Sequence, residues 1–581
     1  MTIEAKNIRK GTLVSAGLLS ALLLVSLAVN FGPADSPVGE AENGIGDESL
    51  ITAIKNERSA EVADLLRRGI DLNVQDELGA TALAWAVVRG HSDVVEQLVR
   101  SGADPNLTNV MGVGPLTLAL ESDSVKIVRL LLENGASANA RSKGGETPLM
   151  MAVHTGSAES VQLLLSHGAD PDARADQFGQ TALMRATGQP EIVRMLLNHG
   201  ADPGLTTKSW TITAVNYTPI IHTLGVTGIP WSHDGEYQIK AGGQNALHLA
   251  AQKNDLESVK SLLDAGMDVD TVTADGTTPL LAALYHWSAG PSGRNYQFAG
   301  DIEIANLLLD RGAKVDVSDQ AGYTPLHGAA LILVLKDPEG AQRLAFNPAQ
   351  ANRPDRPRPS PPKDAGNVVT LVQRLIDAGA DPNQPTLLKT PGPVNVVRIN
   401  PCPPGSTPFH VIAASRSEAL AKLFSQHGAD PNRVRDDGHT PFSLAVMNND
   451  LPLVKVMVEY GADIHRRYDP IDLLPDPVES ETLARSQQSI LHIAAVQGSE
   501  WVISYLVAKG APLDAINDAG ETPLALADAL ERYRVAKETE GFLGSPLSEN
   551  LERETQTTDA FRAAYLQEGL DPSSEQARLA Y

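Results

Sequence analysis

The stretch that decides the fold is residues 144–172, which read GGETPLMMAVHTGSAESVQLLLSHGADPD. Thr147 can cap a helix through its hydroxyl, and Pro148 suits the first helical position because its missing N–H would have no partner there. Gly168 can end a helix in the left-handed conformation. The stretch therefore predicts two short helices followed by a turn at Asp170.

The apolar positions in this stretch indicate packing against neighbours. Leu149 and Ala152 point to one face of the first helix, and Val161, Leu164 and Leu165 form a stripe at helical spacing on the second. One such unit cannot bury its own apolar face, so stability requires stacking of similar units.

The same pattern recurs along the chain at a period close to 33. Its helix-ending glycines are Gly69, Gly102, Gly135, Gly168, Gly200, Gly266, Gly312, Gly379, Gly428, Gly461 and Gly510. Its helix-starting positions are Thr81, Gly114, Thr147, Thr181, Asn245, Thr278, Thr324, Thr407, Thr440, Ser489 and Thr522. On these motifs the sequence resembles the ankyrin-repeat family, with about eleven to twelve units over roughly residues 48–545. The resemblance implies an all-α solenoid of helix-turn-helix units that binds proteins.

Larger steps between glycines indicate departures from the regular repeat. We expect regular repeats over residues 48–204, a decayed repeat or aromatic insertion at 205–243, and further repeats over 244–545. Insertions interrupt the latter block at 286–300, 334–366, 384–406 and 465–488. The tail, residues 546–581, has no recognisable repeat motif. A helix around residues 549–567 is expected to cap the last repeat.

The N-terminus carries a membrane-targeting signal. Residues 11–34 contain no charged side chain, follow a basic segment (residues 1–10) and precede an acidic linker (residues 35–47). This length can span a bilayer, and the charge bias predicts a cytoplasmic N-terminus with the repeats outside the cytoplasm. In a bacterium that location is the periplasm or another extracytoplasmic space. Cleavage of this segment as a signal peptide, which would release the protein, is the alternative.

Composition argues against several classes of function. The formal net charge is −24, which disfavours nucleic acid as a partner. No catalytic motif or metal-ligand spacing is recognisable, so we expect a non-enzyme without cofactor, metal or small-molecule substrate. The single cysteine, Cys402, lies between prolines and is interpreted as an inert thiol.

The repeat also accounts for most of the 14 histidines. Those at the fourth position of the Thr-Pro-Leu-His motif are expected to bond within the turn, and those before a Gly-Ala-Asp step occupy a structural slot. The first group is His248, His327, His410 and His492, and the second is His167, His199 and His427. The Gly-Ala-Asp carboxylates are interpreted as turn formers.

Specificity is expected to lie in the five insertions. Insertions at 205–243, 384–406 and 465–488 fall between repeats, on the edge that the resemblance assigns to partner binding, whereas those at 286–300 and 334–366 fall between the helices of one repeat. Binding candidates are Trp210, Tyr217, Trp231, His233, Tyr237, Trp287, Tyr296 and Arg467. The rings are either partner anchors or local packing groups that hold the loops to the solenoid.

The leading hypothesis is a membrane-tethered or exported scaffold that binds a protein. Two alternatives stay open: a small enzyme-like site around Trp231, His233, Asp234 and Tyr237, and a secreted effector that binds host proteins.

Overall fold

The computed structural model describes residues 47–214, 237–289, 296–335, 365–387, 402, 404–468, 487–497, 500–528 and 547–568. Within these ranges the side chains of residues 47–49, 212–214, 237–239, 286–289, 296–299, 335, 365, 497 and 547–555 are not described. The apolar segment at residues 11–34 lies outside the described residues. No described helix combines the length and apolar character needed to cross a membrane.

The chain divides into two compact units. The first comprises residues 1–212 and 240–274, and the second comprises residues 213–239 and 275–581. Both are built from the same helical pair, and each is described by itself.

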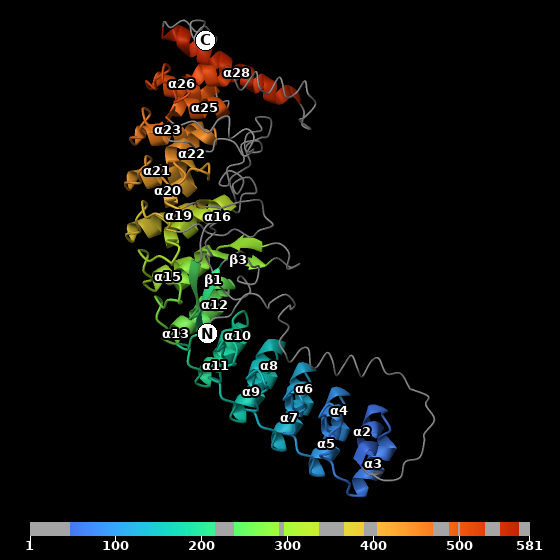
Figure 1. Ribbon diagram of the computed structural model, residues 1–581. Coiled ribbons are helices and arrows are strands. Elements are labelled where there is room, and N and C mark those ends of the chain that lie inside the picture. Colours follow the sequence, from blue (N-terminus) through green and yellow to red (C-terminus); the bar gives the residue numbers. More distant parts are fainter. Residues whose placement is uncertain are drawn as a thin grey trace. The chain divides into compact units, whose positions relative to one another are not determined.

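In each unit the first helices of the repeats stack in one row and the second helices in another (Figure 1). The first helices are α2 (Asp47–Lys55), α4 (Ala82–Val88), α6 (Pro115–Glu121), α8 (Pro148–Thr155), α10 (Ala182–Ala186), α12 (Ala246–Gln252), α14 (Pro279–Leu284), α16 (Pro325–Leu335), α20 (Pro408–Ile412), α22 (Pro441–Met447) and α25 (Ile490–Gln497). The second helices are α3 (Ser59–Arg67), α5 (Ser92–Arg100), α7 (Val125–Glu133), α9 (Ala158–Ser166), α11 (Pro190–Asn198), α13 (Leu256–Asp264), α15 (Ile302–Asp310), α19 (Ala365–Asp377), α21 (Glu418–Gln426), α23 (Leu451–Glu459), α26 (Glu500–Ala508) and α28 (Leu547–Gln567).

The helix signals of residues 144–172 act as predicted. The Thr147 hydroxyl accepts a hydrogen bond from the Met150 N–H, and Pro148 occupies the first turn of α8. Gly168 follows α9 with a φ of +79°, in the left-handed region where a side chain would be strained. Leu149, Val161 and Leu164 are almost completely buried. The stacking that buries them joins α6 to α8 and α7 to α9.

A ladder of asparagine side chains ties each repeat to the next. Asn106 donates to the Gly135 carbonyl at 3.0 Å and accepts from the Ser137 N–H at 2.7 Å. Asn432 makes the same pair of bonds with Gly461 and Asp463. Each spans 29 residues to the glycine. The neighbouring repeats are thus held in fixed register by bonds that depend on one side chain.

The structure corrects the expectation of an all-α fold. It is mostly helical, but its described residues also form three two-stranded β-ribbons. They are β1 (Ser209–Ala214) with β2 (Tyr237–Gly242), β3 (His286–Ala289) with β4 (Tyr296–Ala299), and β5 (Arg467–Tyr468) with β6 (Gln488–Ser489). In the antiparallel pairs β3–β4 and β5–β6, Trp287 faces Phe298 and Tyr468 faces Gln488. All three ribbons enclose insertions, since a long loop that leaves and re-enters one repeat brings its two ends side by side.

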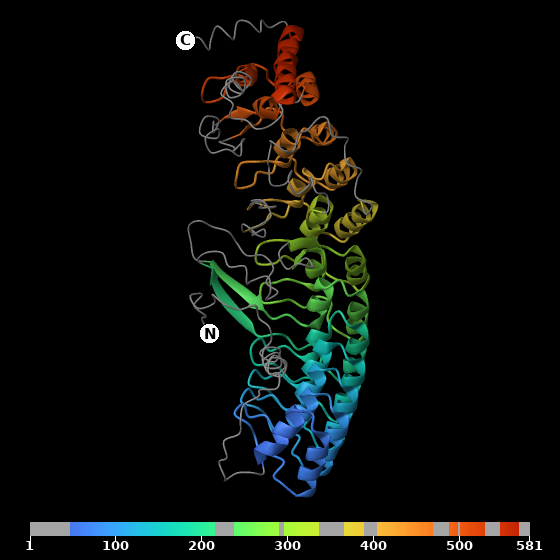
Figure 2. The ribbon, with the colours of Figure 1, turned by 90° about the vertical axis from the view of Figure 1, so that its right-hand side faces the viewer.

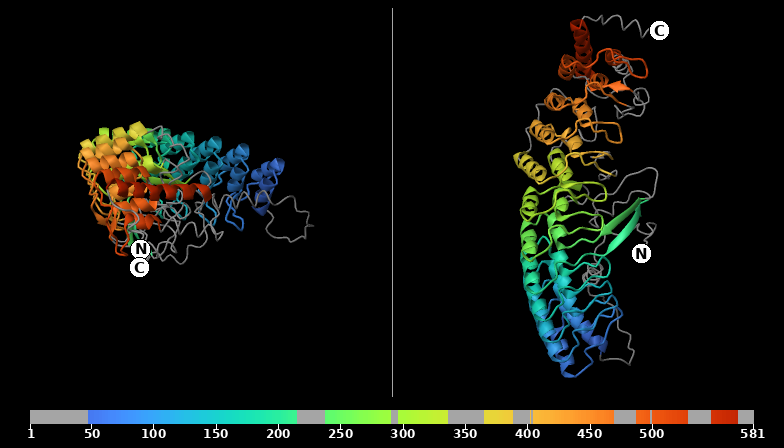
Figure 3. Two further views of the ribbon diagram at one scale, coloured as in Figure 1. Left: turned by 90° about the horizontal axis from the view of Figure 1, so that it is seen from above. Right: turned by 90° about the vertical axis from the view of Figure 1, so that its left-hand side faces the viewer.

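The segment 205–243 does not separate the repeats on either side of it. Helix α11 contacts α13, and α10 contacts α12, as consecutive repeats do elsewhere in this unit. The repeats α10–α11 and α12–α13 are therefore direct neighbours in the stack. Figures 2 and 3 show β1 and β2 leaving the helices on the side of the inter-repeat segments.

The helix expected near residues 549–567 is present as α28, and it packs on α26. Phe561, Ala564 and Tyr565 are buried, and the Tyr565 hydroxyl donates to the Leu513 carbonyl at 2.6 Å. Second helices stack on one another in the same way where α21 meets α23 and α23 meets α26. Helix α28 thus takes the place of the second helix of a last repeat, whose first helix begins after Thr522.

Candidate protein-interaction surface

The inter-repeat segments are hairpins, which we call fingers, and one backbone bond closes each of them. The residue seven positions after the helix-ending glycine donates its N–H to the carbonyl of the residue before the next helix cap. This bond closes the short fingers 76–80, 109–113, 142–146, 175–180, 319–323, 435–439 and 517–521, and also the long fingers 207–244 and 386–406. The finger 468–488 closes through the β5–β6 pairing.

The side chain at the first position of a finger reinforces its closure. Asp76, Asn109, Asp319 and Asn517 each accept hydrogen bonds from the backbone N–H groups two and four residues later. In the long fingers 207–244 and 386–406 this position holds threonine: the Thr207 and Thr386 hydroxyls accept from the Gln244 and Ser406 N–H groups, across 37 and 20 residues. The tip can therefore lengthen while the base keeps the same geometry.

Three insertions consequently extend finger tips. The segments predicted at 205–243, 384–406 and 465–488 overlap the long fingers 207–244, 386–406 and 468–488, whose described bases lie between repeats. Those at 286–300 and 334–366 lie between α14 and α15 and between α16 and α19, inside single repeats as predicted.

Neighbouring fingers are bonded to each other near their tips. In the first unit, Val110 donates to the Leu78 carbonyl at 3.1 Å, and Lys208 donates to the Phe178 carbonyl at 2.8 Å. In the second unit, Gln320 donates to the Asp275 carbonyl at 2.7 Å. Within each unit these bonds join neighbouring tips into a row, which we call the finger edge of that unit, and they fix its backbone before any partner arrives.

Exposed apolar side chains concentrate in these inter-repeat segments. Among the described residues, the large hydrophobic side chains that stay exposed there are Val110 (53%), Met111 (45%), Val272 (58%), Leu387 (62%), Val434 (39%) and Ile516 (54%). Three others, Tyr460, Trp501 and Leu566, belong to second helices or their ends. Exposed apolar groups on a fixed backbone are typical of a binding surface.

Among the aromatic binding candidates, Trp210 is the one whose side chain the structure describes. It is half-buried at the start of β1, and its ring lies 5.6 Å from the Phe178 ring of the preceding finger. A Cβ on Gly242 would come within 2.8 Å of it, so only glycine fits opposite this ring. Trp210 therefore has a packing role, and its exposed part stays available to a partner.

The other candidates are less completely placed. Tyr217, Trp231 and His233 lie outside the described residues, as does Asp234. For Tyr237, Trp287 and Tyr296 the structure gives the strand position alone. These predictions stay untested.

Arg467 is exposed, but its guanidinium is engaged with backbone. It donates to the Gln487 carbonyl at 3.2 Å, within its own finger, and to the Ile516 carbonyl at 3.1 Å, in the next one. Arg141 and Gln75 occupy the same position six residues after their glycines, and they too reach the carbonyl of the equivalent residue in the next repeat. This side chain thus joins fingers, a role that spacing alone did not reveal.

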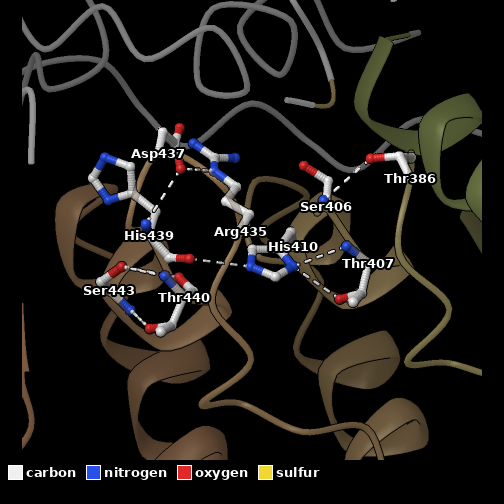
Figure 4. A network of polar contacts seen from close by, with 9 residues as sticks. All are labelled: Thr386, Ser406, Thr407, His410, Arg435, Asp437, His439, Thr440 and Ser443. Atoms are coloured by element: carbon white, nitrogen blue, oxygen red, sulfur yellow. Dashed lines mark hydrogen bonds and ion pairs between the residues drawn. The ribbon is translucent and has the colours of Figure 1, made fainter. Parts of the chain in front are cut away.

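The motif histidines form the polar network between the helix rows and the fingers (Figure 4). The Thr407 N–H donates to His410 Nδ1 at 3.0 Å, and His410 Nε2 lies 3.3 Å from the His439 carbonyl oxygen in the next finger. Because a carbonyl can only accept, Nε2 carries the proton and the ring is neutral. His492 repeats the arrangement with the Glu521 carbonyl.

Burial keeps these rings neutral. Desolvation lowers the pKa of His410 to about 3, with the positive charge of Arg435 adding to the effect. Desolvation also lowers the pKa of His327 and of His492 to about 4, and that of His439 to about 3. The rings therefore serve as hydrogen-bonding struts, which confirms the structural role predicted for the motif histidines.

Arg435 and Asp437 complete this network. The Arg435 side chain is only 6% exposed, and its Nε donates to Asp437 Oδ1 at 2.6 Å. Burial tends to raise the pKa of Asp437, but the Arg435 charge and the His439 backbone bond outweigh it and leave the pKa lowered. The pair stays ionised inside the finger and stabilises the turn at 435–439.

The second group of histidines caps helix ends. His167, His199 and His427 each place Nδ1 2.8 Å from the carbonyl four residues earlier, in the last turn of α9, α11 or α21. Each ring thus adds a hydrogen bond to a carbonyl in the last turn of its helix, and the Leu163 and Met195 carbonyls also accept the backbone N–H of the same histidine.

Cys402 does not offer a reactive thiol. It is fully buried, and desolvation raises its pKa to about 12 despite a hydrogen bond with Tyr323. Across the part of the chain that the structure describes, no group of three His, Cys, Asp or Glu side chains is arranged to hold a metal ion.

Comparison with known proteins identifies the repeat. A family model described as ankyrin repeats in three copies matches residues 50–142, 136–207 and 364–468, and one described as ankyrin repeats in many copies matches residues 247–287. A search of curated proteins finds no significant match. Among solved structures, the crystal structure of the ankyrin repeat domain of Bcl-3, titled a unique member of the IkappaB protein family, is 26% identical. It covers 45% of this chain and 99% of its own, with a TM-score of 0.34. The matched ranges together exceed half of the sequence, and the chain belongs to the ankyrin-repeat family, which is generally non-catalytic.

Proposed function

We propose that this protein is a scaffold that holds a partner protein along its finger edge. Ankyrin repeats serve protein–protein interaction, which supports the general function. The observation that carries the location is the exposed apolar side chains in the inter-repeat segments of each unit: Val110 and Met111 in the first, and Leu387, Val434 and Ile516 in the second. Backbone bonds already join neighbouring fingers, as between Val110 and Leu78 and between Leu387 and Ala321. A partner that covers these side chains removes apolar area from water without having to order the loops that carry them.

A crosslinking experiment tests this location. A photoreactive amino acid at Met111 in the first unit, or at Ile516 in the second, is expected to crosslink the partner in cells. The matched control places it at Arg129 on α7 or at Lys422 on α21, where exposed side chains form ion pairs on second helices. Equal crosslinking from fingers and second helices, or crosslinking from the helices alone, would overturn the proposal.

The predicted contrast between insertions gives a second test. Variants Trp231→Ala and Arg467→Ala in long fingers are expected to weaken partner capture, whereas Trp287→Ala, in the ribbon inside one repeat, is expected to leave it intact. Because Arg467 also joins two fingers, its variant needs a melting curve beside the binding assay. Loss of capture with Trp287→Ala alone would reverse the assignment.

We further propose that the repeats work outside the cytoplasm, tethered by residues 11–34. The support is the sequence of the N-terminus, with its uncharged run after basic residues. Fractionation and N-terminal sequencing of the mature protein separate the outcomes. An intact N-terminus in the membrane fraction supports the tether, a chain beginning after residue 28 supports release, and a cytosolic chain contradicts both.

A further inference from the structure

Four exposed cations gather on neighbouring fingers of the first unit. They are Arg141, Lys143, Arg174 and Lys208, which we call the basic finger patch. Among the described residues of these finger segments, the exposed anion near the tips is Asp176, whose side chain is 65% exposed and which Arg141 meets at 3.2 Å. Glu146 is neutralised by a two-pronged pair with Arg185 at 2.5 and 2.6 Å. The patch is therefore locally positive on a chain whose net charge is −24.

Carbonyl oxygens hold three of these cations, Arg141, Arg174 and Lys208, in place without cancelling their charge. Arg141 donates to the Arg174 carbonyl at 2.6 Å, Arg174 donates to the carbonyls of Gly179 and Thr206, and Lys208 donates to the Asp176 carbonyl. A carbonyl oxygen carries no net charge, and a guanidinium has five N–H donors, so further donors stay available. On the second helices of the same unit the pattern differs, because Arg129 pairs with Glu159 and Lys126 with Asp93.

The turns at the base of the fingers carry two exposed carboxylates, which form no ion pair with the patch within the described residues. Asp170 and Asp202 are exposed, but each accepts a hydrogen bond from the backbone N–H two residues later, which fixes it in its own turn.

Apolar groups adjoin the cations. The stem of Lys143 lies over Gly112, where an added Cβ would be 3.4 Å from Lys143 Cγ, beside the exposed Met111. Lys208 directly precedes β1 and stands two residues before Trp210, which packs on Phe178. Fixed cations interleaved with apolar and aromatic groups match a ligand that alternates carboxylates with apolar side chains.

We infer that the basic finger patch binds an acidic, apolar-containing segment of the partner protein. The inference rests on the proposed function, since it names the kind of partner that the finger edge takes. Charge complementarity favours this occupant over a basic or neutral segment, and the preorganised guanidinium groups favour carboxylates.

Binding of a defined probe tests the inference. The probe is a fluorescein-labelled peptide of about twelve residues that alternates Glu with Phe and Leu, and its counterpart carries Lys in place of Glu. The full chain is expected to bind the acidic peptide and not the basic one. Raising sodium chloride from about 50 to about 300 mM is expected to weaken binding several-fold, because exposed charges are screened.

Charge reversal locates the site. The double variant R141E/K143E is expected to weaken peptide binding about tenfold. The matched control K126E/R129E, with both substitutions on α7, is expected to leave binding unchanged. The single variant K143E separates lost binding from misfolding, because Lys143 forms no ion pair within residues 47–214 that the substitution could break. Equal binding by the patch and control variants, or no binding of the acidic peptide, would overturn the inference.

Further outcomes distinguish failure of the acidic-segment inference from failure of the proposed scaffold function. Binding to vesicles that contain phosphatidylserine, without binding to the peptide, would reassign the patch to a membrane surface. If the peptide fails to bind while a photoreactive group at Met111 still captures the partner, the acidic-segment inference fails and the scaffold function stands. If both fail, the finger edge is not the binding surface.

Discussion

The short finger 435–439 and the long finger 386–406 share one base and differ in their tips. In both, the first residue donates to the carbonyl of the last, and a histidine of a first helix reaches that carbonyl: His410 reaches His439, and His327 reaches Ser406. The histidine bond spans 29 residues in one case and 79 in the other, because the second span includes two insertions. The fold therefore tolerates long additions wherever they leave the closing bonds intact.

Acidification should destabilise short and long fingers alike, and we expect it to have the largest effect on stability. His327, His410, His439 and His492 have pKa values of about 3 to 4 in the folded chain, against about 6.5 when unfolded. Between these values the unfolded chain binds more protons, so their contribution is fully present above pH 6.5 and is lost as the pH falls toward 4. We expect the free energy of unfolding of the second unit to drop by at least a few kcal/mol over this range.

Urea unfolding followed by circular dichroism at several pH values measures this drop. The variant His427→Gln keeps a donor at a helix end and should show the same pH dependence as the wild type. Constant stability between pH 7 and pH 4.5 would contradict the neutral-histidine assignment.

Removal of one histidine strut comes next in size. His327→Ala and His410→Ala each leave a buried N–H without its partner, remove one of two hydrogen bonds to a buried carbonyl and open a cavity, so each should cost about 3 kcal/mol. Similar losses in urea unfolding would show that a long finger depends on its strut as a short one does. A negligible loss for His327→Ala would mean that the long finger is held by other contacts.

The short finger 319–323 contains a carboxyl group that should make stability fall as the pH rises, which is opposite to the effect of the histidines. Burial raises the pKa of Asp319 to about 7, and the nearby Asp275 charge adds to the rise. Between pH 3.8 and 7 the folded chain binds more protons, so stability falls as the pH rises through this range.

Asp319→Asn keeps the acceptor and removes this cost, and the chain itself uses asparagine at the equivalent Asn517. We expect the variant to exceed the wild type by about 1–3 kcal/mol at pH 8 and to show no gain at pH 4, measured by urea unfolding. The reciprocal Asn517→Asp should lose stability at pH 8. Equal stability of Asp319→Asn and wild type at pH 8 would contradict the raised pKa.

The smallest effect concerns the asparagine ladder across a long finger. Asn383 bonds to Gly428 and Asp430 across the finger 386–406, and Asn432 bonds to Gly461 and Asp463 across a short one. Because both residues are half-buried to a similar degree, each alanine variant should lose about 1 kcal/mol in thermal unfolding, with little difference between them. A clearly smaller loss for Asn383→Ala would indicate that the long finger loosens its junction.

Much of this architecture was predictable from the sequence because the repeat is local chemistry. Thr147, Pro148 and Gly168 each specify a helix start or end through their own backbone preferences, and the buried stripe follows from helical spacing. The structural role of His410 was predictable for the same reason, since its Nδ1 bond stays within four residues.

Other features escaped prediction because they depend on partners far along the chain. Arg467 was a binding candidate, and its bond to Ile516 lies 49 residues away. The role of α28 was also missed, although Gly569, Asp571 and Pro572 after it repeat the pattern of the other helix ends. An unusually long gap between the two helices of that repeat hid the match.

The sequence by itself determined the family, the register of the helices and the places where insertions occur, because each rests on residues within one repeat. Only the tertiary structure decided that three insertions extend finger tips, that the tips within each unit are bonded into an edge, and that Arg141, Lys143, Arg174 and Lys208 come together on the edge of the first unit. The physical reason is that stacking brings residues one repeat apart into contact, and no local signal records which charges meet there.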